Sequence, residues 1–159
     1  EFIIVTENSI YLVDKEILKK PILYLSDFFE RNKTLYYDNL MKARTENNIV
    51  QWLKFFLVGV IETAQKGVQT FDAILKLKQN TELSIQNLGI RANNAQKIIH
   101  YLFKHPMIEV NKVVEITGVS KRTGYHLIDD LEKLKILKEI TGSKRDKLYV
   151  FSSYLNLFK

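Results

Sequence analysis

Apolar residues recur every three or four positions through most of the chain, which is the spacing of an amphipathic helix. Pro21 interrupts this pattern, because proline lacks the helical donor and disfavours helix in the residue before it. Four helices are therefore predicted in the first half: Ile10 to Leu18, Ile22 to Glu30, a third from Thr34 onwards, and Ile49 to about Lys78.

Two of these helices carry more specific expectations. In the third, we expect Thr34 to cap the first turn and Leu35, Leu40 and Met41 to face a core. The first part of the longest helix, from Ile49 to Ile61, is apolar on most sides, which predicts a central helix packed by neighbours on several sides.

The second half contains three shorter helical segments. Asn93 to Lys104 is amphipathic and ends at His105-Pro106, and Val110 to Thr117 follows as a short helix. Gly118 stands where a tight turn needs positive φ, and Ser120 can cap a helix over Lys121 to Leu134. Two helices joined by a glycine turn are typical of a helix-turn-helix.

The end of the chain adds two strand-like segments, Ile136 to Thr141 and Leu148 to Phe151. The polar, basic tip between them is typical of a wing. The predicted fold is therefore mainly α, with a helical bundle followed by a winged helix-turn-helix domain that contains a small β-hairpin. We place the bundle in residues 1–80, a connector in 81–92 and the winged domain in 93–159.

This arrangement predicts a nucleic-acid site. A helix fits the major groove of DNA, and a basic hairpin beside it can contact the neighbouring backbone. Arg122 is the best candidate for contact with the edge of a DNA base. The predicted contact residues are Ser120, Lys121, Arg122, Tyr125 and His126 from the helix, and Lys144, Arg145 and Lys147 from the wing.

The charge distribution supports a polyanionic partner for the second half. The net charge is +6, from 24 basic and 18 acidic residues. Glu1 to Ile85 contains 11 of each, which leaves 13 basic and 7 acidic residues in the remainder. Double-stranded DNA is thus the predicted partner, although Asp129 and Asp130 reduce the positive charge of the helix face.

Composition excludes several other classes. The chain has no cysteine, so disulfides and thiolate metal sites are absent, as fits a cytoplasmic protein. Its longest apolar stretch, Phe55 to Ile61, is far shorter than the roughly 20 residues of a membrane span, and no membrane partner is expected. No nucleophile and base, metal cluster or glycine-rich phosphate loop has a recognisable spacing, so no catalytic, cofactor-binding or metal-binding residue is predicted.

Spaced aromatic blocks in the first half resemble those of a known family. The blocks are Lys20-Pro21-Ile22-Leu23-Tyr24-Leu25-Ser26, Phe28-Phe29-Glu30-Arg31-Asn32, Tyr36-Tyr37-Asp38-Asn39-Leu40 and Trp52-Leu53-Lys54-Phe55-Phe56-Leu57. Together with the winged segment, which many bacterial members carry at the C-terminus, they resemble Fic family proteins. The resemblance covers roughly Tyr11 to Phe158.

The resemblance implies a parent enzyme that transfers AMP from ATP to a protein hydroxyl, with ATP and Mg as cofactors. The family's loop, H-P-F-x-x-G-N-G-R, is absent here, because His105-Pro106 is followed by neither its glycines nor its arginine. The family's inhibitory glutamate pattern is also missing at Glu7 and Glu46, which lack the leading hydroxyl residue. We therefore expect a catalytically inactive C-terminal part, cut shortly after that loop.

An alternative function keeps the same fold. The winged domain would then dock a target protein or another copy of the chain, and Trp52, Phe55 and Phe56 would contribute because loss of a catalytic half exposes apolar surface.

Overall fold

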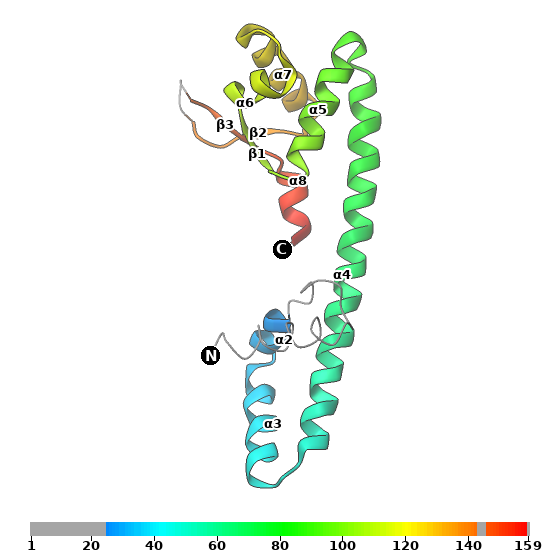
Figure 1. Ribbon diagram of the computed structural model, residues 1–159, viewed down its shortest axis with the longest axis vertical. Helices are drawn as coiled ribbons and strands as arrows, with labels where there is room; N and C mark the ends of the chain where they lie inside the picture. The colour runs from blue at the N-terminus through cyan, green and yellow to red at the C-terminus, as the bar shows by residue number, and fades with distance from the viewer. Residues whose placement is uncertain (1–24, 143–145, 159) are drawn as a thin grey trace. The chain divides into compact units, whose positions relative to one another are not determined.

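The protein, described here from a computed structural model for residues 25–142 and 146–158, is mainly helical with a small three-stranded antiparallel sheet (Figure 1). Contacts between Cα atoms divide it into two compact units, Glu1–Gln69 and Thr70–Lys159, and each unit has a hydrophobic core of its own. The predicted helix over Ile10 to Leu18 lies outside the described residues, as does the start of the one predicted from Ile22.

The first unit is built on an aromatic core. Helices α2 (Leu25–Arg31), α3 (Lys33–Thr45) and the first part of α4 (Ile49–Gln86) supply it. The Phe28 ring lies 5.3 Å from that of Phe55, and the Phe29 ring lies 6.3 Å from that of Trp52. Aromatic rings bury large areas and gain from stacked and edge contacts, which lets a core of few residues hold three helices.

Helix α3 presents a different face from the one predicted. Leu35 and Met41 are 54% and 60% exposed, and the helix starts one residue before Thr34, with no side-chain cap. Tyr36 faces inward instead, because its ring packs 5.0 Å from Phe29, and Asn39 is buried with its amide donating to the Leu35 carbonyl oxygen. The expectation for Leu35 and Met41 was wrong.

Helix α4 is not enclosed on several sides within the part of the chain that the structure describes. One face carries Trp52, Phe55 and Phe56 toward the aromatic core. The opposite face is exposed and apolar, with Val50, Leu53, Leu57, Ile61 and Val68. The predicted central helix is therefore, among the described residues, a helix with one packed face.

Helix α4 also continues past its expected end near Lys78, through the predicted boundary at Gln79-Asn80-Thr81, to Gln86. The polar side chains there bond within the helix. Thr81 is buried, and its hydroxyl donates to the Leu77 carbonyl oxygen at 2.7 Å, as the Ser84 hydroxyl does to that of Asn80 at 2.8 Å. Such back-bonding satisfies hydroxyl groups inside a helix.

The second unit combines the end of α4, further helices and the small sheet around one hydrophobic core. After η1 (Gly89–Arg91) come α5 (Ala92–Leu102), β1 (Met107–Glu109), α6 (Val110–Thr117) and α7 (Lys121–Lys133). Strands β2 (Lys138–Glu139) and β3 (Leu148–Val150), then α8 (Ser152–Leu155) and η2 (Asn156–Phe158), complete it. The strand order is β1-β3-β2, with Ile108 opposite Tyr149 and Lys138 opposite Val150.

The core of this unit follows the predicted periodicity. Its fully buried side chains come from α5, α6 and α7, together with Ile108 of β1 and Phe151 directly after β3. They include Ala95, Ile98, Ile99, Leu102, Val113, Leu127, Ile128 and Leu131. The predicted bounds of α6, the positive φ of Gly118 and the cap at Ser120 are confirmed, whereas strand β1 was not predicted.

Candidate nucleic-acid interface

The start of α7 is fixed by a side-chain cap. Ser120 has extended backbone angles, φ −63° and ψ 155°, and its Oγ accepts a hydrogen bond from the Thr123 amide at 3.3 Å. Its Oγ also lies 3.0 Å from the Thr123 hydroxyl. The cap satisfies one of the free amides of the first turn, so the predicted contact residue Ser120 has a structural role at this position.

A tight connection holds α7 against α6. Gly118 ends α6 in the left-handed region at φ 71°, and its amide donates to the Val114 carbonyl oxygen at 2.8 Å. Gly124 then lies so close to α6 that an added Cβ would be 3.3 Å from Val114 Cγ2. Because of this close approach, the position of α7 is determined by α6 and the turn.

The first turns of α7 present four of the predicted contact residues together. Lys121, Arg122, Tyr125 and His126 are all exposed, and they lie on the side of α7 away from the buried Leu127 and Leu131. Within residues 25–142 and 146–158, neither Lys121 nor Arg122 has an ion-pair partner. Both cations are thus exposed, without a counter-ion among the described residues.

The two aspartates of α7 differ in environment. Asp129 is exposed, whereas Asp130 is buried, and Arg91 Nη1 lies 2.5 Å from its Oδ2. That oxygen has no aligned hydrogen bond among the described residues, so the contact is an ion pair by distance. Arg91 offsets the charge of Asp130, which leaves Asp129 as the acidic group exposed on α7 before its last turn.

The predicted wing is described only in part. Lys144 and Arg145 lie outside the described residues. Lys147, partly exposed, has its Nζ 3.7 Å from Glu139 Oε2. The predicted wing contacts at Lys144 and Arg145 stay predictions, and the charge of Lys147 is partly offset by a carboxylate.

Glu139 organises the base of this hairpin. Its Oε1 accepts hydrogen bonds from the Thr141 hydroxyl at 2.7 Å, the Gly142 amide at 2.7 Å and the Thr141 amide at 3.1 Å. These bonds, the Thr141 hydroxyl foremost, and the Lys147 ammonium lower the pKa of Glu139 because they favour its charged form. The carboxylate is thus ionised at neutral pH and holds the residues that lead into the tip.

Sequence reasoning missed the roles of Arg91 and Glu139. Arg91 was placed in a connector, and its partner Asp130 lies 39 positions later, a distance at which spacing carries no signal. For Glu139 a signal existed, because a carboxylate followed two residues later by threonine and then by glycine can accept amide bonds in a turn.

Two other kinds of feature are absent from the part of the chain that the structure describes. No group of three or more His, Cys, Asp or Glu side chains is placed to hold a metal ion there. The described helices also include none with the length and apolar character needed to span a bilayer. No protein-family model matches the chain.

Proposed function

We propose that residues 93–159 form a winged helix-turn-helix domain that binds double-stranded DNA. In this proposal α7 enters the major groove, and the hairpin between β2 and β3 contacts the adjacent backbone. Lys121 and Arg122, with Lys144, Arg145 and Lys147, contact phosphates, while Arg122 also reaches a base edge through its two-pronged guanidinium.

One observation carries the proposal: Lys121 and Arg122 are exposed and unpaired among the described residues, on the first turn of a capped helix. The amino-terminal residues of a recognition helix are those that meet base edges, so this is where cations are most effective. The succession of α6, the Gly118 turn, α7 and a β2–β3 hairpin gives further support.

A titration of labelled duplex DNA, followed by fluorescence anisotropy at several salt concentrations, tests the proposal. Logarithmic affinity is expected to fall with logarithmic salt by about 0.9 for each phosphate neutralised. Arg122→Ala should weaken binding by about tenfold, and Lys121→Ala should reduce the salt slope by about one.

A matched control lies on the same helix. Lys133 is exposed in the last turn of α7, three turns from the proposed contacts, and Lys133→Ala removes the same charge. It should leave the affinity within about twofold of the original. Equal effects of Arg122→Ala and Lys133→Ala would contradict the assigned surface and indicate attraction by net charge alone.

We also propose that residues 1–80 are related to the helices that follow the active-site loop of Fic proteins. Support comes from the aromatic blocks that carry the resemblance, since Phe28, Phe29, Tyr36, Trp52 and Phe55 pack together. AMP transfer, with ATP and Mg, is proposed for a parent protein that has the loop. No catalytic residue is assigned in this chain.

A second candidate function, self-association, is favoured by the exposed apolar face of α4. Val50, Leu53, Leu57 and Ile61 follow one another at spacings of three, four and four, which fits the side of another helix. A second copy offers the same stripe, as a two-fold symmetric interface requires. Trp52, Phe55 and Phe56, which were expected to contribute, lie partly buried against the aromatic core instead.

Sedimentation velocity over a range of protein concentrations tests this function. The unmodified chain is expected to form dimers as concentration rises, and Leu57→Glu should keep it monomeric because it places a charge in the apolar stripe. Gln69→Glu is the control, since Gln69 is exposed on another side of α4 and the change adds the same charge. A chain that stays monomeric at every concentration contradicts self-association.

A further inference from the structure

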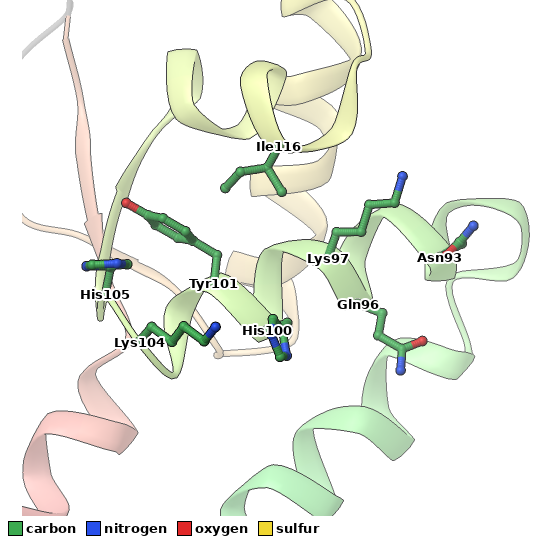
Figure 2. A pocket seen from close by; sticks show the side chains of 8 residues that line it. All are labelled: Asn93, Gln96, Lys97, His100, Tyr101, Lys104, His105 and Ile116. Carbon is green, nitrogen blue, oxygen red and sulfur yellow. The ribbon is translucent and has the colours of Figure 1, made fainter.

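A basic and aromatic hollow in the second unit is not used by the proposed DNA contacts. It has a volume of about 590 Å³ and lies along α5 beside α6. Figure 2 shows the Tyr101 ring between the two helices, with Ile116 above it and His105 beside it. The lining residues are Asn93, Gln96, Lys97, His100, Tyr101, Lys104, His105 and Ile116.

The wall of the hollow is aromatic and apolar. The rings of Tyr101 and His105 lie 4.8 Å apart, with their planes tilted by 32°. Lys112 Nζ is 5.6 Å from the centre of the Tyr101 ring, where Glu115 holds it through a 2.6 Å hydrogen bond. Ile116 adds aliphatic surface, so a flat ring would meet both aromatic and aliphatic side chains here.

The charged groups that line the hollow are all basic. Lys97 and Lys104 are exposed, and neither has an ion-pair partner among residues 25–142 and 146–158. In Figure 2, Lys97 rises from α5 on the same side as Tyr101 and Ile116, whereas Lys104 lies in the turn after α5, below the Tyr101 ring in this view. Lys97 is therefore the cation best placed to meet a negative group on a ligand that contacts the ring.

We propose that this hollow binds a small molecule made of an aromatic ring and an anionic group. The ring would lie against Tyr101 and Ile116, and Lys97 would pair with the phosphate or carboxylate. Small-molecule sites combine apolar walls with a few polar groups, as the lining of this open hollow does. The site is separate from Lys121 and Arg122, so it does not depend on the DNA proposal.

Nuclear magnetic resonance titration of the whole chain with phenyl phosphate and with benzoate tests the site. At least one of them should shift the signals of Tyr101 and Ile116 saturably, and the pair shows which anion is preferred. Inorganic phosphate and benzyl alcohol, which each lack one half of the proposed ligand, should bind at least about tenfold more weakly. Lys97→Gln should reduce the affinity for the better of the two ligands by about tenfold, and Lys133→Gln should leave that affinity unchanged.

Four outcomes overturn the proposal. They are the absence of saturable shifts with both compounds, equally strong binding of inorganic phosphate, shifts confined to α7, and an affinity that Lys97→Gln leaves unchanged. Tyr101→Leu provides a second variant, because leucine keeps apolar packing at a partly buried position while removing the ring. Tyr101→Leu should weaken the binding of phenyl phosphate or benzoate and leave the unfolding midpoint close to that of the original chain.

Discussion

Gly59→Ala is expected to destabilise the first unit, whereas Gly67→Ala on the same helix is expected to stabilise it. A Cβ on Gly59 would lie 2.6 Å from Phe28 Cδ1, closer than carbon atoms can pack. The Phe28 ring is buried and lies against the rings of Phe29 and Phe55, so it cannot move aside without disturbing them. Overpacking of this kind costs about 1–3 kcal/mol, against a gain in helix propensity of roughly 0.8–1 kcal/mol, so the net destabilisation expected is up to about 2 kcal/mol.

Gly67 supplies the matched control. It is exposed, and an added Cβ would meet no atom within 4 Å, so alanine there contributes only the gain in helix propensity, roughly 0.8–1 kcal/mol. The two variants make the same chemical change in α4, with opposite expected signs. Trp52 is the one tryptophan of the chain and lies in this core. Its fluorescence during urea unfolding therefore measures the free energy of unfolding of both variants. Equal stabilisation by both alanines would contradict the packing of Phe28 against Gly59.

Features set by a few neighbouring residues could be predicted from the sequence. Gly118 ends α6 because only glycine reaches positive φ without a penalty, and Ser120 caps α7 through a bond three residues away. The buried positions of α5 follow from a pattern contained within the helix. Local chemistry of this kind depends little on the rest of the fold.

Features that depend on distant partners could not be predicted. Strand β1 has three residues, too few for an alternating pattern, and pairs with β3 about forty positions later. The inward face of α3 is chosen by the Phe29 ring rather than by its own periodicity, so Leu35 and Met41 were misplaced. Helix α4 also runs on through Thr81, whose burial and bond to Leu77 are not revealed by polar composition alone.

The candidate interface divides in the same way. Exposure of Lys121, Arg122, Tyr125 and His126 follows from their place opposite the apolar face of α7. The ion pair by which Arg91 offsets the charge of Asp130 could not be foreseen, because its two residues lie in separate elements. Whether these cations contact DNA stays a prediction.

Leu131→Ala is expected to destabilise the second unit by about 3–5 kcal/mol, because Leu131 is fully buried and its loss leaves a cavity between helices. Leu83→Ala makes the same change in helix α4 at a side chain that is 61% exposed, and should stay within about 0.5 kcal/mol. The rate of amide hydrogen exchange at Ile98 and Leu102 measures the stability of both variants. Leu131→Ala should accelerate this exchange roughly a hundredfold or more.

Leu131→Ala also separates support of the fold from contact with DNA. Its side chain faces the core, so at low temperature, where most molecules stay folded, the variant should bind DNA as the original chain does. Arg122→Ala should give the opposite pattern, with weakened binding and unchanged amide exchange, because its exposed side chain makes no core contact. If both variants lose affinity in proportion to stability, Arg122 acts through the fold, and its assignment to the DNA surface is wrong.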